Sequence, residues 1–316
     1  ARHWEEQVTR LRIATRGSAL ARWQADHVAA LLHKADPAVE AEVVVVETSG
    51  DRRLDVPIWE LGGKGVFVKE VQAAVLDGRA DLAVHSAKDL PSATPEALVI
   101  AAVPERADVR DALVGATLAD LPEGAVVATG SLRRRAQIAH ARPDLRFEGL
   151  RGNMATRVAR AGTDGVAAVV VAAAALDRLA WGDRIAERLA VDVVLPQVGQ
   201  AALAVECRAD DARVRTALAA IEDGPSRRAV DAERGFLAEL GGDCSVPAAA
   251  YAEVAGRGTD ADLTVRGLVA TVDGAALVRH EVWGAARDGE ALGRALARHL
   301  LDDQGGAELL GRTSRP

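Results

Sequence analysis

Short apolar runs alternate with amphipathic segments from the start of the chain. Residues 11–16, LRIATR, predict a strand that ends at Gly17, and Ser18 is a candidate N-cap for the helix that follows. One face of that helix carries residues that recur close to every 3.6 positions: Leu20, Trp23, His27, Val28 and Leu31. The chain therefore opens as strand, turn and helix.

The same alternation continues through most of the chain. Residues 43–46 predict a second strand, 67–76 a helix and 82–84 a buried strand. The pattern then restarts, with strands expected at 126–129, 145–150, 166–171 and 203–207, and helices at 132–141, from 153 and up to 179. Repeated β-α-β units predict an α/β fold with two lobes, each built on a mostly parallel sheet.

The last third of the chain has a different pattern. Asp223-Gly224-Pro225-Ser226 is a strong break, and the helix that follows stops at Gly241-Gly242. Asp273-Gly274 is a two-residue hairpin signal, and a final helix is expected at about 288–301. These elements predict a small α+β domain. We therefore expect three domains: residues 1–103 with 202–222, residues 104–201, and residues 223–316.

Charge and composition narrow the function classes. The chain has 316 residues and carries 39 Lys and Arg against 46 Asp and Glu, a net charge of −7. This balance argues against general attraction to nucleic acid or to acidic membranes. The first residues hold no apolar leader segment, and no window approaches ~18 uninterrupted apolar residues. We expect a cytoplasmic protein with no membrane partner.

Residues 85–91, HSAKDLP, place polar and charged side chains where the buried strand 82–84 ends. Pro91 closes the segment because proline cannot continue a sheet ladder. In open α/β sheets, ligands bind at the carboxyl ends of the strands. Asp89 beside Lys88 is therefore a candidate for chemistry, although a plain polar turn explains the same residues.

Arginines are concentrated near the starts of predicted helices. Guanidinium groups and helix N-terminal N–H groups together bind anions, so this repetition favours a cleft for carboxylates or phosphates. Any one of them alone is equally well explained as a solvated surface arginine. The set comprises Arg16, Arg133, Arg134, Arg135, Arg151 and Arg157, with Arg178 at the end of another helix.

Two other interpretations of the basic segments are weaker. Arg133-Arg134-Arg135 could bind the phosphates of a nucleic acid, but the chain is acidic and no aromatic stacking surface lies near this cluster in the sequence. Gly62-Gly63-Lys64-Gly65 lacks the Ser or Thr that follows the lysine of a P-loop. We expect neither a nucleic-acid partner nor a nucleotide site.

The two cysteines have different sequence settings. Cys207 lies in an apolar strand and is most simply a small core residue. Cys244 follows Gly241-Gly242-Asp243 on a predicted loop past a helix, where a thiol can meet a ligand. Two cysteines are too few for a zinc cluster on their own, and we expect no metal.

Several motifs together resemble the hydroxymethylbilane synthase family, also called porphobilinogen deaminase. In chain order they are HSAKDLP at 85–91, SLRR at 131–134, RGN at 151–153 with Arg157, VGQ at 198–200 and GGDCSVP at 241–247. The likeness runs from about residue 11 to the last helix. It implies two α/β lobes of the type II periplasmic-binding-protein kind and a third, α+β domain.

The resemblance implies a transferase of tetrapyrrole and heme biosynthesis. Its family adds porphobilinogen units to a dipyrromethane cofactor held by a thioether, and then releases the linear tetrapyrrole hydroxymethylbilane with water. The cysteine matches Cys244, and the catalytic aspartate, which stabilises the cation left when ammonia departs, matches Asp89. Positions that match cofactor- or substrate-binding residues are Arg16, Ser18, Lys88, Ser131, Arg133, Arg134, Arg151, Arg157 and Arg178.

The remaining implications concern the lid and the partners. Residues 48–65, with Lys64, match a mobile loop over the cleft, and Phe67 matches a nearby aromatic residue. The partners are then porphobilinogen and the growing linear polypyrrole, bound by a monomer.

Asp243 departs from the usual motif, in which Gly-Gly directly precedes the cysteine. The rival hypothesis is a non-catalytic bilobal anion-binding protein, which explains the arginines but gives Cys244 no task.

Overall fold

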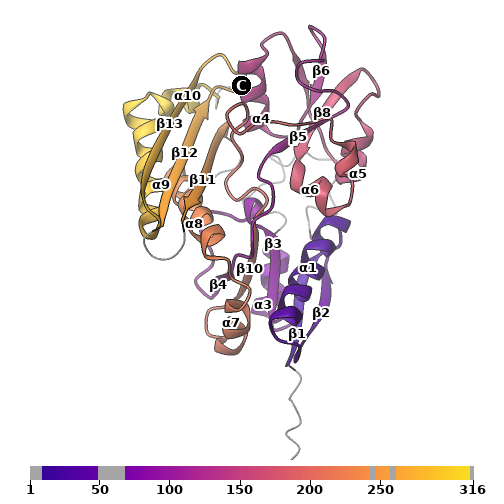
Figure 1. The fold of residues 1–316 in the computed structure, drawn as a ribbon, viewed down its shortest axis with the longest axis vertical. Helices are drawn as coiled ribbons and strands as arrows, with labels where there is room; N and C mark the ends of the chain where they lie inside the picture. Colours follow the sequence, from indigo (N-terminus) through magenta and orange to yellow (C-terminus); the bar gives the residue numbers. More distant parts are fainter. Residues whose placement is uncertain (1–8, 49–67, 242–245, 257–260, 314–316) are drawn as a thin grey trace, which may run out of the picture. The chain divides into compact units, whose positions relative to one another are not determined.

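The computed structural model describes residues 9–48, 68–241, 246–256 and 261–313 (Figure 1). Contacts between Cα atoms divide the chain into two compact units. Unit 1 comprises residues 1–105 and 202–227, and unit 2 comprises residues 106–201 and 228–316. The division into three domains stays a prediction.

Unit 1 is built on a five-stranded sheet with the strand order β2-β1-β3-β10-β4. Strands β2, β1 and β3 run parallel, and β10 lies antiparallel between β3 and β4. The strands are β1 (Thr9–Arg16), β2 (Val39–Val46), β3 (Leu82–Ser86), β4 (Leu98–Ala102) and β10 (Leu203–Arg208). The sheet therefore combines three parallel strands, the edge strand β4, and one strand, β10, that returns from the other unit.

Helices cover both faces of this sheet because successive strand residues point to opposite sides. Ile13 of β1 shares one apolar cluster with helices α1 (Ala19–Ala35) and α7 (Ala212–Ala219). The next residue, Ala14, belongs to another cluster with helix α3 (Lys69–Leu76). The near-continuous apolar character of β1 and β3 follows from this burial on both faces.

Unit 2 repeats the same sheet plan with the order β7-β6-β8-β5-β9. Strands β7, β6 and β8 are parallel, and β5 is antiparallel to both of its neighbours. The strands are β5 (Asp111–Val114), β6 (Val126–Ala128), β7 (Arg146–Glu148), β8 (Val166–Ala172) and β9 (Glu187–Arg188). Helix α4 (Leu132–Ala141) packs on one face, and helices α5 (Met154–Ala159) and α6 (Ala173–Arg178) pack on the other.

The C-terminal part of unit 2 is a three-stranded antiparallel meander, β11-β12-β13, with helices against it (Figure 1). Its core joins Phe236, Leu263 and Leu296, all fully buried. A Cβ at Gly293 would lie 1.9 Å from the carbonyl oxygen of Ala232, so this glycine permits the close approach of α9 to α8. The elements are α8 (Gly224–Glu239), β11 (Ala248–Ala255), β12 (Asp262–Ala270), β13 (Leu277–Ala285), α9 (Gly289–Arg298) and α10 (Gly306–Thr313).

The predicted fold class is confirmed: two α/β sheet-and-helix lobes and a small α+β part. Helix α4 has the predicted bounds, and Gly274 has a φ of +73° in the predicted hairpin turn. The short strands β4, β5 and β9 and the longer β11 were not predicted. The helix predicted at about 288–301 corresponds to α9, which ends at Arg298, together with a π-helical turn over His299–Asp303. A further helix, α10, follows this turn.

Candidate functional site

A small pocket lies in unit 1 where strands β1 and β3 end. Because parallel neighbours end at the same edge of a sheet, the residues that follow them meet there. The pocket is lined by Thr15, Arg16, Ala21, Gln24, Val68, Val84, His85, Ser86 and Asp89. The structure therefore brings together Arg16 and Asp89, two of the residues that the sequence selected.

Asp89 reaches the pocket through a single turn of 3₁₀ helix, Ala87–Asp89, directly after β3. Its side chain is exposed, and among the described residues its carboxylate has no hydrogen-bond or ion-pair partner. Lys88 is half-buried beside it. An accessible carboxylate at a strand end is free to face a cationic group of a ligand.

The start of helix α1 forms another part of the pocket wall. Ser18 caps this helix as predicted, since its Oγ accepts a hydrogen bond from the N–H of Ala21 at 3.3 Å. Gln24, one turn on, donates from Nε2 to the Oγ of Ser86 at 2.9 Å. This bond explains why the polar Gln24 is buried and why the buried stripe of α1 is offset from the one that its apolar residues indicate.

Behind the pocket lies a buried acidic residue that sequence reasoning missed. Glu206 of β10 is fully buried, and its Oε2 lies 3.0 Å from Nε2 of His85. Its two carboxylate oxygens also accept hydrogen bonds from Nε2 of Gln72, at 3.2 and 2.9 Å. The available signal was a glutamate inside the otherwise apolar run LAVEC, because a buried carboxylate needs a partner.

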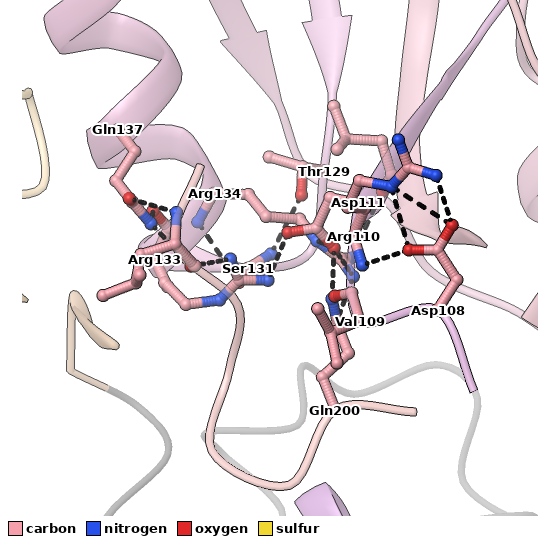
Figure 2. A network of polar contacts seen from close by, with 12 residues as sticks. Asp108, Val109, Arg110, Asp111, Thr129, Ser131, Arg133, Arg134, Gln137 and Gln200 are labelled. Atoms are coloured by element: carbon pink, nitrogen blue, oxygen red, sulfur yellow. Dashed lines mark hydrogen bonds and ion pairs between the residues drawn. The ribbon is translucent and has the colours of Figure 1, made fainter. Parts of the chain in front are cut away.

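Unit 2 holds a second cluster at the start of α4 (Figure 2). Arg133 and Arg134 are buried, and both form ion pairs with the fully buried Asp111 of β5, at 2.8 and 2.7 Å. Arg133 also donates from Nη1 to the carbonyl oxygen of Leu195 at 2.7 Å. Ser131 caps the helix by accepting from the N–H of Arg134 at 3.4 Å. These two arginines are therefore fixed in place before any ligand binds.

The electrostatics of this cluster favour an additional negative charge. Burial alone would raise the pKa of Asp111, but the charges of Arg133 and Arg134 outweigh it and hold that pKa at about 2. Burial lowers the pKa of Arg133, an effect that Asp111 opposes. One carboxylate and two guanidinium groups leave the cluster with one excess positive charge. Among the described residues, Nε of Arg133 is buried without a hydrogen-bond partner.

Gln200 links this cluster to helix α8 through a chain of buried polar contacts. Its Nε2 donates to Asp111 Oδ1 at 2.9 Å and to the carbonyl oxygen of Val109 at 2.8 Å (Figure 2). The main-chain carbonyl oxygen of Gln200 accepts a hydrogen bond from Nε of Arg106 at 2.8 Å. Arg106 in turn forms a bidentate ion pair with the fully buried Glu233, in which Nη1 and Nη2 donate to the two carboxylate oxygens at 2.6 and 3.0 Å. No sequence pattern indicated these contacts, since their members are far apart along the chain.

The other predicted arginines of unit 2 lie at the ends of helices. Arg157 donates from Nε to the carbonyl oxygen of Gly152 at 2.8 Å, next to the Asn153 cap of α5. Arg178 donates from Nη2 to the carbonyl oxygen of Ala201 at 2.7 Å, and burial lowers its pKa to about 10. Arg151 is half-buried. Each is therefore anchored to the backbone or partly covered.

Three predicted site residues, Cys244, Lys64 and Phe67, lie outside the described residues, as does all but Thr48 of the predicted lid. Cys207 is described: it is fully buried in β10, and burial raises the pKa of its thiol to about 11. Among the described residues, no helix is long and apolar enough to cross a membrane. The same part of the chain contains no group of three acidic, His or Cys side chains arranged to hold a metal ion.

Comparison with known proteins gives consistent matches over nearly the whole chain. Residues 11–216 match the model of the porphobilinogen deaminase dipyrromethane cofactor-binding domain, and residues 228–302 match that of the porphobilinogen deaminase C-terminal domain. Porphobilinogen deaminase from Geobacter sulfurreducens is 46% identical over 305 residues, covering 96% of this chain and 94% of that protein. The protein of the same name from Moorella thermoacetica is 48% identical over 303 residues, covering 95% of each.

The solved structures that match this chain include a periplasmic domain and a methionine-binding protein, each at a low TM-score. The VFT2 domain of BvgS from Bordetella pertussis is 17% identical with a TM-score of 0.40, covering 69% of this chain and 88% of that one. The methionine-binding protein MetQ is 9% identical, also with a TM-score of 0.40, covering 69% of this chain and 92% of that one.

Proposed function

The chain belongs to the porphobilinogen deaminase family, and from this premise we propose a role for each charged residue of the two sites. The enzyme is a hydroxymethylbilane synthase, a transferase that condenses four porphobilinogen units with loss of ammonia and releases hydroxymethylbilane with water. Its dipyrromethane cofactor supplies the covalently held pyrrole to which the first unit is joined. The protein's own side chains bind the carboxylates of cofactor and substrate and stabilise the charge that develops.

Asp89 is the proposed catalytic residue. Departure of ammonia from porphobilinogen leaves a cation, and a carboxylate close to it lowers the energy of the developing charge. The observation that carries this assignment is the position of Asp89: exposed, in a pocket, and without an ion-pair partner among the described residues. Arg16 in the same pocket is suited to bind a carboxylate of the substrate. Lys88 and Ser18 are proposed to help in that binding.

The arginine cluster of unit 2 is proposed to hold the carboxylates of the cofactor and the growing chain. Every pyrrole unit carries acetate and propionate groups, so negative charge accumulates with each addition. The cluster fits such a ligand because it has one excess positive charge and a buried donor, Nε of Arg133, that is unused among the described residues. A charge-assisted hydrogen bond contributes roughly 1.5–3 kcal/mol. Ser131, Arg134, Arg151, Arg157 and Arg178 are proposed to act with it.

Cys244 is the proposed attachment point of the cofactor. The chain has two cysteines, and the thiol of Cys207 is buried with its pKa raised to about 11. A thiol reacts as its thiolate, so Cys207 is unsuited to forming the thioether.

We further propose that the enzyme acts as a monomer in the cytoplasm, without a nucleic-acid partner. Lys64 and Phe67 keep their proposed places in and near the lid.

The intact mass of the purified chain tests this function. We expect a mass increment equal to one dipyrromethane on the wild type and on Cys207→Ser, and none on Cys244→Ser. Adding porphobilinogen should extend the wild-type increment by further pyrrole units. A wild-type chain that stays unmodified with porphobilinogen, yet binds a polycarboxylate, would favour the rival anion-binding protein.

A further inference from the structure

The turn between β12 and β13, residues 271–276, packs against the C-terminal half of helix α4 within unit 2. A Cβ on Gly274 would lie 2.5 Å from both the carbonyl oxygen of Ala136 and the amide nitrogen of His140. Gly274 also has a φ of +73°. Both features require glycine, because it has no Cβ and tolerates positive φ. The turn and the helix are therefore in direct backbone contact.

A hydrogen bond fixes the turn on the last turn of α4. Nδ1 of His140 lies 2.9 Å from the carbonyl oxygen of Gly274. A carbonyl oxygen only accepts hydrogen bonds, so the imidazole donates from Nδ1–H. This bond has a defined direction, since it reaches a backbone atom whose position is set by the tight turn.

The turn is stiffened by its own polar side chains. The carboxylate of Asp273 accepts hydrogen bonds from Oγ1 of Thr271 and from the N–H of Ala275. These bonds lower the pKa of Asp273, and the positive charge of Arg135 adds to the effect. Arg135, the third of three consecutive arginines, therefore contributes its charge to this turn rather than to the ion pairs of the buried cluster.

An apolar contact lies beside the turn. Helix α4 shares one buried cluster with strands β11 and β12, and the cluster comprises Ala136, Leu195, Ala249, Leu268 and Ala270. Apolar burial favours association but sets no precise register, because the hydrophobic effect is non-directional. The close approach at Gly274 and the bond from His140 supply that register.

The two partners of this contact carry different parts of the proposed site. Helix α4 begins with the buried Arg133 and Arg134, and the turn meets the other end of this helix, which is about 15 Å long. In the sequence, Cys244 lies between α8 and β11, which share one apolar core with β12. A change in how the turn meets α4 therefore changes where the two arginines lie relative to the elements that flank Cys244.

We propose that the β12–β13 turn sets the position of the arginine cluster relative to the cofactor-bearing part of the chain, with Gly274 and His140 as positioning residues for the condensation. Neither residue contacts the substrate in this scheme. A misplacement of about 1 Å can cost about 10²-fold in rate. The proposal rests on the proposed function, since it concerns how the carboxylates of the cofactor meet the arginines.

The test follows the first pyrrole addition to the holoenzyme by intact mass, after quenching at different times. The rate constant reports positioning, and the amplitude reports the fraction of folded, loaded chains. Gly274→Ala is compared with Gly305→Ala, because Gly305 has a similar φ of +76° but no described atom within 4 Å of an added Cβ. We expect the rate constant to fall about 10²-fold in Gly274→Ala and to stay within about two-fold of wild type in Gly305→Ala.

A second pair of variants keeps the test decisive if Gly274→Ala does not fold. His140→Leu removes the donor, whereas His140→Asn places an amide N–H near the position of Nδ1. We expect the rate constant to fall about 5-fold in His140→Leu, as for the loss of one hydrogen bond, and to stay within about two-fold of wild type in His140→Asn.

Three results would overturn the proposal: losses confined to the amplitude, equal rate constants for Gly274→Ala and Gly305→Ala, or equal rate constants for the two His140 variants. A structural role alone predicts the first of these, because unfolded chains lower the amplitude and leave the rate constant of the folded ones unchanged. A wild-type chain that lacks the dipyrromethane increment would instead refute the proposed function.

Discussion

Two aspartates in the two units have opposite surroundings. Asp89 in unit 1 is exposed and has no ion-pair partner among the described residues, whereas Asp111 in unit 2 is fully buried and pairs with two arginines. A carboxylate that stabilises a transient cation must be accessible and uncommitted before the reaction. A carboxylate that fixes arginines must be committed to them. An aspartate in the first setting is suited to chemistry, and an aspartate in the second is suited to holding arginines in place.

The largest expected effect is that of Asp89→Asn on turnover. The amide keeps the size of the side chain but cannot stabilise a cation through a full charge, so kcat should fall by about 10²–10⁴-fold. Because Asp89 is exposed, the free energy of unfolding should change by no more than about 0.5 kcal/mol. Asp77→Asn, at an exposed aspartate after α3, is the matched control. Near-normal turnover of Asp89→Asn would remove Asp89 from the catalytic role.

Asp111→Asn should show the opposite effect, a loss of stability. Removing one partner of a buried ion pair leaves uncompensated charge, here on Arg133 and Arg134, and costs about 3–5 kcal/mol. Urea unfolding followed by fluorescence measures this loss. Asp108→Asn is the control, because Asp108 is partly exposed with Arg110 and Arg188, and should lose about 1 kcal/mol or less. Equal losses in the two variants would contradict the comparison.

Lowering the pH should test the contribution of Asp111 to stability in the wild type, without a mutation at this residue. Its folded pKa, about 2, lies below the ordinary value of 3.8. Its contribution is therefore complete above about pH 4 and is lost as the pH falls toward 2, a difference of about 2 kcal/mol. Unfolding midpoints between pH 5 and pH 2, about the range in which carboxylates titrate, should fall more steeply in wild type than in Asp111→Asn. Parallel curves would show that Asp111 is not held ionised by the arginines.

Gln200→Leu should have the smallest effect. This change removes one hydrogen bond to Asp111 but leaves both of its ion pairs, so the loss of stability should be about 1–2 kcal/mol. It also breaks the side-chain contact between Arg134 and Gln200. We expect a weaker apparent affinity for porphobilinogen with a smaller change in kcat, measured by steady-state kinetics. A loss of stability as large as that of Asp111→Asn would place Gln200, not Asp111, at the centre of the cluster.

The features of the two sites that the sequence predicts are those with local signals. Ser131, the bounds of α4 and the strand that leads to Asp89 follow from caps and apolar periodicity, which are local signals. Asp111 could not be selected from the sequence, because its strand, β5, is only four residues long. The partners of Asp111 lie far along the chain, on α4 and at Gln200. The position of Glu206 beside His85 could not be predicted, because β10 joins the sheet of unit 1 only after the chain has passed through unit 2. Contacts between distant segments therefore account for the residues that were missed.

We propose that Asp89 acts in chemistry and not in binding the cofactor. The most direct test is the intact mass of Asp89→Asn before and after mixing with porphobilinogen, with the wild type in parallel. We expect the variant to carry the dipyrromethane increment and to gain further pyrrole units far more slowly than the wild type. Pyrrole units added at the wild-type rate would contradict this role of Asp89, as would a variant that folds normally but lacks the cofactor increment.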